Sequence, residues 1–389
     1  MNDFRSIRLD NFSASIAACE EGSNLTPTSE EETFESFARE RLRSIYRHLN
    51  TPDGSPHFNA ILEQMLGAFP SVIDDLLRSE GLEVVRTKVS EKISRDGWLA
   101  IADEIGLPPE HPANYDWRFT PETTRNIADY VSKHLENSPD KTICCLGSPT
   151  IAIELVQRGW QGKIVLLDIN TPLVEMIDSY ARNQKADFSS QTYDVQDILP
   201  DHLENIADVV IMDPPWYLDY YRAFLARATT ILSKKGGQIL CPIFPELSRH
   251  GARKDILALQ KELVVMGCQE NELAMIARFL MPGFEEKILQ RQGIATPPVD
   301  WRMAEMRALK FDAHRAKNQA TKFNLEPQCW ARYGDRNTAV VFRGNLGEFI
   351  GHQPSRLESF LSISRHDRRD RDILWWDSNH QCLVVTNKT

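Results

Sequence analysis

The sequence lacks long apolar runs, and this absence excludes a whole class of proteins. No run of about 18 consecutive apolar residues occurs, so we expect no membrane-spanning helix and no membrane partner. The first residues, MNDFRSIRLDNFSAS, also lack the apolar core of a secretion signal. We therefore expect a cytoplasmic protein.

Clustered cysteines and paired histidines are missing as well. The 7 cysteines are scattered, odd in number and without a C-x-x-C pair, which argues against a disulfide framework and a structural zinc site. The 10 histidines show neither H-x-x-H nor H-E-x-x-H spacing, so we expect no metal ion in the site. The net charge of −10 argues against a protein that coats nucleic acid with its whole surface, and it leaves a local basic surface open.

The length of 389 residues suggests two or three domains. Residues 1–30 are expected to be a flexible N-terminus, with a helix beginning near Ser29. Residues 31–112 predict a mostly helical domain in the order helix, turn, helix, short strand pair, helix. That order suits a winged-helix-like domain, and a helical cap that only packs on its neighbour explains it equally well.

After a proline-rich joint at residues 106–124, the pattern changes to strands that alternate with helices or short crossovers. The predicted strands are residues 142–147, 163–169, 190–195, 207–213 and 237–244. Successive strand–helix units indicate a parallel sheet covered on both faces. The predicted fold class is therefore α/β, with a doubly wound, Rossmann-like sheet in a domain over residues 113–345. Ligands of such sheets bind at the carboxyl ends of the strands.

Beyond residue 270 the order of elements is less regular. Residues 272–280 and 337–344 are candidates for two closing strands. Between them we expect an insert at about 281–336, followed by a C-terminal extension at 346–389. The stretch 287–323 carries eight Lys or Arg against three acids. A solvated charged helix explains this composition, and a surface that tracks phosphates is the alternative.

Three strand ends carry residues suited to an adenosine-containing cofactor. The first strand ends at a small turn with Gly147, where the backbone can approach a ligand closely. The second ends at Asp168, whose carboxylate can accept hydrogen bonds from ribose hydroxyls. The third ends near Asp194, which can meet an adenine amino group. Each acid taken alone could be a helix cap or part of a surface turn, but their recurrence at successive strand ends favours a cofactor crevice.

The fourth strand runs directly into Asp213, Pro214, Pro215, Trp216 and Tyr217. Two successive prolines cannot extend a sheet, so they force a stiff, extended turn. The Asp carboxylate and nearby carbonyls can accept hydrogen bonds from an amino group, while an aromatic side chain stacks on a flat ring. We therefore predict that these five residues form a catalytic site that orients an NH₂ group towards an electrophile. A purely structural Asp-Pro-Pro turn is the alternative.

Residues 142–244 resemble the class I S-adenosylmethionine-dependent transferases. Asp-Pro-Pro-Trp resembles the [DNS]-P-P-[YFW] motif of amino methyltransferases, above all the adenine-N6 group. The resemblance implies that Asp213 and the carbonyl of Pro214 bind the target amine while Trp216 stacks on it. The segment RFTPETT resembles the F-T-P element that closes over the methionine end of the cofactor in many such enzymes. The cofactor-binding residues implied by these matches and their neighbours are Thr120, Pro121, Leu146, Gly147, Ser148, Asp168, Ile169, Asp194 and Val195.

Residues 58–245 also resemble the branched-chain polyamine synthases, which transfer aminopropyl groups from decarboxylated S-adenosylmethionine. The order of a winged-helix-like domain, NYDWRFTPETT, LLDIN, YDVQDILPD and DPPW carries this resemblance. That family has an acidic G-D-D-D-L turn after its first strand, which helps to hold the polycationic substrate. Here the turn runs from Gly147 to Thr150 and contains no acid, which argues against a polyamine.

The preferred hypothesis is an enzyme that uses S-adenosylmethionine to methylate an amino nitrogen, foremost adenine N6 in DNA or RNA. A base in a duplex would have to be flipped out to reach Trp216, and the winged-helix-like segment and the basic stretch are the candidate nucleic-acid contacts. The alternative is aminopropyl transfer from decarboxylated S-adenosylmethionine to a small amine or polyamine. A second alternative is a non-catalytic, nucleotide-binding regulator. Protein lysine as acceptor and a homodimer stay open.

Overall fold

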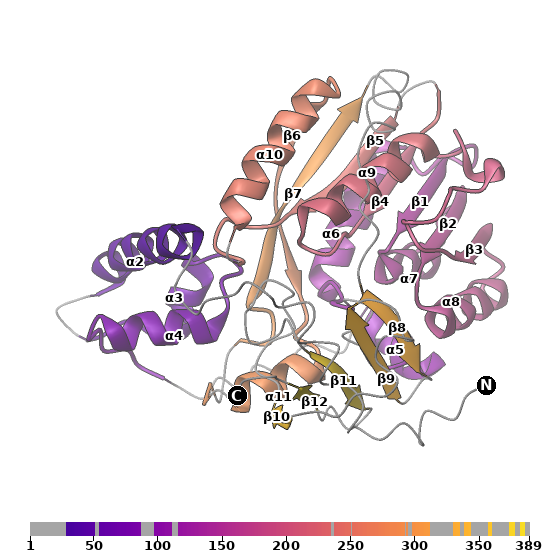
Figure 1. Ribbon diagram of the computed structural model, residues 1–389. Helices are drawn as coiled ribbons and strands as arrows, with labels where there is room; N and C mark the ends of the chain where they lie inside the picture. Colours follow the sequence, from indigo (N-terminus) through magenta and orange to yellow (C-terminus); the bar gives the residue numbers. More distant parts are fainter. Residues whose placement is uncertain are drawn as a thin grey trace.

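The computed structural model gives the architecture shown in Figure 1. The residues that the structure describes are 29–50, 54–86, 97–110, 116–234, 237–249, 251–291, 293–294, 298–311, 330–334, 338–343, 357–359, 373–377 and 382–385. In this part of the chain no helix combines the length and the apolar character needed to cross a membrane.

Three helices near the N-terminus form a small bundle, drawn at the left of Figure 1. They are α2 (Ser29–Leu49), α3 (Phe58–Gln64) and α4 (Pro70–Ser79). Leu42, Ile61 and Ile73 are fully buried, so α2 packs its apolar stripe on the two shorter helices. Arg39 and Arg43 both pair with Glu80, which fastens α2 to the end of α4.

The winged-helix prediction for this region is not confirmed. A parallel bridge joins His57 to Val85, but the described residues contain no strand pair here, and residues 87–96 lie outside the described part. Helix α5 (Trp98–Ile105) packs on α6 (Pro121–His134) and α7 (Pro149–Gln157). Its contacts are therefore with the sheet domain, although we placed these residues in the N-terminal domain.

The main sheet has seven strands in the order β3-β2-β1-β4-β5-β7-β6. The strands are β1 (Thr142–Leu146), β2 (Lys163–Asp168), β3 (Phe188–Thr192), β4 (Val209–Met212), β5 (Gly237–Ile243), β6 (Gln269–Phe279) and β7 (Arg302–Phe311). Strands β1 to β5 pair in parallel, whereas β7 runs antiparallel between β5 and β6. The predicted α/β, Rossmann-like sheet is confirmed.

Helices cover both faces of this sheet, because its central strands are apolar on both sides. Helices α6, α7 and α8 (Thr171–Asn183) pack side by side, and α9 (Leu218–Ile231) packs against α10 (Ala252–Val265). A 3₁₀ turn, η4 (Asp201–Leu203), lies in the crossover from β3 to β4.

One of the two predicted closing strands is wrong. Residues 272–280 do form β6, but residues 337–344 contain β9 (Thr338–Arg343), which belongs to a separate five-stranded sheet. The second closing strand is instead β7, which pairs with β5 and lies inside the stretch that we expected to be an insert. The separate sheet has the order β10-β12-β11-β9-β8. Its other strands are β8 (Trp330–Gly334), β10 (Leu357–Ser359), β11 (Ile373–Asp377) and β12 (Cys382–Val385), and α11 (Gly283–Arg291) precedes β7.

Candidate active site at the carboxyl ends of the strands

The Asp-Pro-Pro-Trp segment forms a tight turn where β4 ends. The backbone N–H of Asp213 donates to the carbonyl of Leu146 over 3.2 Å, which keeps the turn beside the end of β1. The N–H of Tyr217 then donates to the carbonyl of Pro215 over 2.7 Å. Because neither proline has an N–H, the chain cannot continue the ladder and instead turns the two aromatic side chains inward. Trp216 and Tyr217 are buried.

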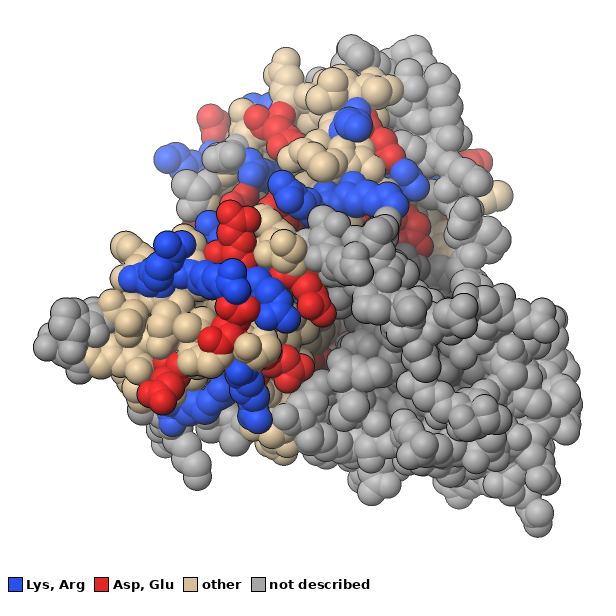
Figure 2. Space-filling view, turned by 60° about the vertical axis from the view of Figure 1, so that its left-hand side comes forward, with Lys and Arg blue, Asp and Glu red and all other residues tan. Residues whose placement is uncertain are grey.

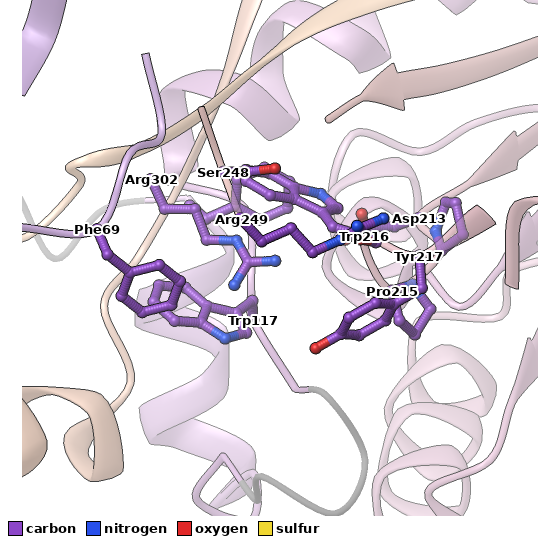
Figure 3. A pocket seen from close by; sticks show the side chains of 11 residues that line it. Phe69, Trp117, Asp213, Pro215, Trp216, Tyr217, Ser248, Arg249 and Arg302 are labelled. Atoms are coloured by element: carbon purple, nitrogen blue, oxygen red, sulfur yellow. Dashed lines mark hydrogen bonds between the residues drawn. The ribbon is translucent and has the colours of Figure 1, made fainter. Parts of the chain in front are cut away.

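A pocket opens at this turn, shown in Figure 3. The five residues from Asp213 to Tyr217, all predicted from the sequence, line it together. Residues from five other parts of the chain complete the wall, and none of them was assigned to a site from the sequence. These are Phe69, Trp117, Ser248, Arg249, Phe279 and Arg302. Trp117 belongs to the NYDWRFTPETT segment and Arg302 to the basic stretch, but neither was predicted to line this pocket.

An arginine occupies the centre of the aromatic wall. The guanidinium carbon of Arg302 lies 3.8 Å from the centre of the Trp216 ring and 4.3 Å from that of Trp117. Phe279 meets Trp216 edge to face, with ring centres 5.7 Å apart. Arg302 is the first residue of strand β7 and belongs to the basic stretch that we considered as a phosphate-tracking surface. One arginine of that stretch therefore lines the pocket.

Arg249 holds the backbone of the turn by a hydrogen bond. Its Nε donates to the carbonyl of Trp216 over 2.6 Å, and its second nitrogen pairs with Asp255. The guanidinium also lies over the Tyr217 ring, 5.0 Å from its centre. The geometry of the turn is thus fixed by a charged group whose donors are used by the protein itself.

Burial sets the charge state of the pocket. It raises the pKa of Asp213 well above its usual value, and the negative charges of Asp168 and Asp116 raise it further, while Arg302 lowers it. Burial also lowers the pKa of Arg302 to about 10, against the opposing effect of Asp213 and Glu285. At neutral pH Arg302 therefore stays a cation, and Asp213 is a carboxyl group with raised basicity.

The predicted cofactor turn lies directly beside this pocket. Gly147 has φ +64°, and a Cβ there would lie 3.0 Å from the Phe224 ring and 3.5 Å from the carbonyl oxygen of Asp213. Glycine adopts this φ without strain, whereas a side chain here would press on the Phe224 ring. The Oγ of Ser148 donates to the carbonyl of Ile211 over 3.0 Å, which joins the turn to β4.

Asp168 ends β2 and is within electrostatic range of Asp213. One of its carboxylate oxygens accepts from the N–H of Asn170 over 2.8 Å. Burial raises its pKa to about 7, Asp116 adds to that effect, and Arg118 opposes it. The neighbouring Ile169 is exposed, with 42% of its surface accessible.

Asp194 lies two residues beyond β3, which ends earlier than predicted. Its carboxylate accepts from the N–H of Gln196 over 2.9 Å, and burial raises its pKa. Val195 is buried, and its carbonyl accepts from Arg227. Both acids thus form local turns, as the alternative reading required, while each keeps a second carboxylate oxygen for a ligand.

Thr120 and Pro121 begin α6 rather than reaching the pocket wall. Thr120 Oγ1 accepts from the N–H of Thr123, and its own N–H donates to the carbonyl of Arg278 over 2.9 Å. Pro121 stands in the first turn of α6, where a missing N–H costs nothing. These residues anchor α6 to β6, and their contact with the cofactor stays a prediction.

Two observations on the described residues bear on the expected absence of a metal ion and on the alternative of a basic surface. They contain no group of three His, Cys, Asp or Glu side chains that could hold a metal ion. Figure 2 shows Lys and Arg interspersed with Asp and Glu on the face that carries the N-terminal helices. The N-terminal helices also carry ion pairs, such as those of Arg39 and Arg43 with Glu80.

One family model matches the part of the chain that forms most of the main sheet. Residues 106–277 match the family model described as the branched-chain polyamine synthase A C-terminal domain, which is less than half of this chain. The match agrees with the predicted resemblance to that family and with the predicted transferase. It includes α6, strands β1 to β5 and most of β6.

Solved structures of branched-chain polyamine synthase from Thermus thermophilus share the fold. The C9 mutein, in complex with N4-aminopropylspermidine and 5′-methylthioadenosine, gives a TM-score of 0.55 at 13% identity, covering 72% of this chain and 91% of that one. The unmutated enzyme with the same two molecules gives 0.53 at 13% identity, covering 77% and 92%. An uncharacterized protein of Methanocaldococcus jannaschii is 26% identical over 111 residues, or 28% of this chain and 27% of that protein. The chain thus spans about a quarter of the length of that curated relative.

Proposed function

We propose that this protein transfers an alkyl group from a sulfonium nucleoside to an amino nitrogen, and that the group is aminopropyl, from decarboxylated S-adenosylmethionine. One observation carries the proposal, namely the close approach of the two turns. A Cβ atom added to Gly147 would lie 3.5 Å from the carbonyl oxygen of Asp213. The turn suited to a nucleoside and the pocket suited to an amine therefore share one wall. The polyamine synthase match over residues 106–277 favours aminopropyl as the transferred group.

The residues at the strand ends fit an adenosine-containing cofactor. Gly147 has no side chain and a positive φ, so a nucleoside can approach the backbone of this turn closely. Asp168 uses one carboxylate oxygen for Asn170 and keeps the other for ribose hydroxyls. When bound, the sulfonium of the cofactor supplies an electrophilic carbon next to the pocket.

The chain's own groups then orient the amine. The Asp213 carboxylate accepts a hydrogen bond from the amine and directs its lone pair towards the crevice. Because burial raises the pKa of Asp213, this carboxylate is a stronger base than an exposed one and can take up the proton that the amine releases. The buried Trp216 and Tyr217 exclude water from the reacting nitrogen.

Methyl transfer to an amino nitrogen, including adenine N6, is the second candidate. The turn from Gly147 to Thr150 carries no acid to hold a polycation, and Arg302 adds a positive charge beside Trp216. Under this candidate a flipped base would stack on Trp216, and nucleic acid would be the partner. A homodimer stays a prediction under either candidate.

The experiment compares the two sulfonium donors. Calorimetry measures binding of S-adenosylmethionine and of its decarboxylated form, and chromatography follows the nucleoside product after incubation with amines. Preference for the decarboxylated donor and release of 5′-methylthioadenosine support aminopropyl transfer. Release of S-adenosylhomocysteine selects methyl transfer instead. Binding without any product supports the third hypothesis, a non-catalytic nucleotide-binding regulator.

A further inference from the structure

The guanidinium of Arg302 projects into the pocket between two indole rings (Figure 3). It forms no hydrogen bond and no ion pair with any residue that the structure describes, and its Nε is buried. A guanidinium that stacks on aromatic faces keeps its N–H donors in the plane of the group, pointing away from the rings. The pocket thus contains a charged fork of donors for which the described chain provides no acceptor.

The nearest negative charges are held apart from Arg302. Asp213 and Glu285 both act on it electrostatically, yet neither lies within ion-pair distance. Glu285 is fully buried on α11, does not line the pocket, and has no hydrogen-bond partner for either carboxylate oxygen among the described residues. In its ionised form, Glu285 can balance the charge of Arg302 through space without occupying its N–H donors.

The pocket is therefore bipolar. Asp213 and the proline carbonyls are acceptors, which suit an amine, whereas Arg302 is a donor, which suits an oxyanion. A linear polyamine has only ammonium and amine groups, so it offers nothing to Arg302 and is repelled by its charge. A molecule with an amine and an acidic group satisfies both ends.

We propose that the acceptor is an amine that also carries an oxyanion, a carboxylate or a phosphate, and that Arg302 binds this oxyanion while Asp213 holds the amine. The proposal rests on the proposed transfer to an amino nitrogen and names its substrate class. It makes Arg302 a specificity-determining residue that acts by direct contact with the acceptor.

Matched pairs of amines test this assignment. Ornithine is putrescine with a carboxylate added, and O-phosphoethanolamine is ethanolamine with a phosphate added, so each pair differs only in the oxyanion. Turnover is measured with the preferred sulfonium donor, and binding of each amine is measured by calorimetry in the presence of 5′-methylthioadenosine. We expect at least one acidic member to exceed its partner by about 10-fold or more in kcat/KM and in affinity. A larger preference in the ornithine pair indicates a carboxylate as the oxyanion, and a larger preference in the O-phosphoethanolamine pair indicates a phosphate.

Variants assign the preference to the arginine. Arg302→Gln should abolish it, Arg302→Lys should restore it in part because the charge returns without the fork, and Arg307→Gln on the same strand should leave it unchanged. Circular dichroism and thermal unfolding check that each variant is folded. If Arg302→Gln does not fold, Arg302→Lys still shows whether the side chain at this position changes the affinity for the acidic amines.

The two proposals fail in different ways. If putrescine is turned over and ornithine and O-phosphoethanolamine show no preference, the transfer stands and the oxyanion site is overturned. If an acidic amine binds in an Arg302-dependent manner without turnover, the oxyanion site stands and the transfer to that amine is overturned. Absence of Arg302-dependent binding by either acidic amine also overturns the oxyanion site.

Discussion

The hydroxyl of Ser148 donates a hydrogen bond to the carbonyl of Ile211 over 3.0 Å, joining the turn after β1 to strand β4. Ser148 is buried, so Ser148→Ala removes a bond that water cannot replace. We expect a loss of about 1–2 kcal/mol in unfolding free energy, together with weaker cofactor binding. Denaturant unfolding and calorimetry measure both. Ser179→Ala is the control, since its hydroxyl also bonds to a backbone carbonyl but is exposed, and an equal loss there would contradict the argument.

Gly147→Ala should weaken cofactor binding and destabilise the fold. Alanine at φ +64° is strained, and its Cβ would lie 3.0 Å from the buried Phe224 ring. Gly159→Ala is a matched control, because Gly159 has φ +68° but nothing within 4 Å. Both variants bear the same backbone strain, so the overpacking adds about 1–3 kcal/mol at Gly147 alone. Equal melting temperatures for the two variants would refute the close approach.

Asp213→Ala and Asp168→Ala should separate chemistry from cofactor binding. Under the proposed function, loss of the Asp213 carboxylate removes the group that orients the amine, so we expect turnover to fall by about 10² or more with cofactor affinity within about twofold of the wild type. Asp168→Ala should instead weaken cofactor binding by about tenfold, because one hydrogen-bonded ribose contact is lost. Turnover assays and calorimetry on both variants measure catalysis and cofactor affinity separately. Wild-type turnover by Asp213→Ala would remove it from the catalytic site.

Glu285→Gln should change how stability depends on pH. Burial raises the pKa of Glu285 from 4.5 to about 7, with Arg302 opposing the effect. The folded state therefore holds this proton more tightly, and wild-type stability is lost as pH rises from about 4.5 through 7. The loss is on the order of 3 kcal/mol. Glutamine cannot ionise, so the stability of the variant relative to wild type should increase between pH 5 and pH 8, as measured by urea unfolding. A difference independent of pH would show that the carboxyl group does not titrate there.

Trp98→Phe tests whether α5 is part of the sheet domain. The indole N–H of Trp98 donates to the carbonyl of Phe119 over 3.0 Å, just before α6. Losing this buried bond should cost about 1–3 kcal/mol in unfolding free energy. Trp160→Phe is the control, since Trp160 is also buried but its indole N–H has no partner among the described residues. A larger loss at Trp160 than at Trp98 would contradict this role for α5.

Much of the sheet could be predicted because its parallel strands have a clear sequence pattern. Strands such as β1 and β4 are short, continuous apolar runs that precede helices, so both their position and their order follow from the pattern. Strand β7 gave no such signal. Charged residues interrupt it, including Arg302, Glu305 and Lys310, and they resemble those of a solvated helix until the neighbouring strands are known.

The same difference separates the two halves of the candidate site. The turn at Asp213 could be found because paired prolines after an apolar strand are rare and stiff. The rest of the wall could not, because Phe69, Phe279 and Arg302 come together only through the packing of distant elements. No local pattern marks an arginine as buried between indoles when its partners lie far away in the chain.

Strand β7 lies between β5 and β6 in the sheet, although β6 comes before β7 in the chain. During translation β6 leaves the ribosome first, yet it has no place in the sheet until residues 302–311 follow. An expression fragment trimmed to residues 106–277 would end within β6 and lack β7, so the whole edge of β5 would stay unpaired. Such a fragment is a template for intermolecular strand addition and should precipitate, whereas a fragment that extends to residue 311 pairs this edge of β5 with its own β7.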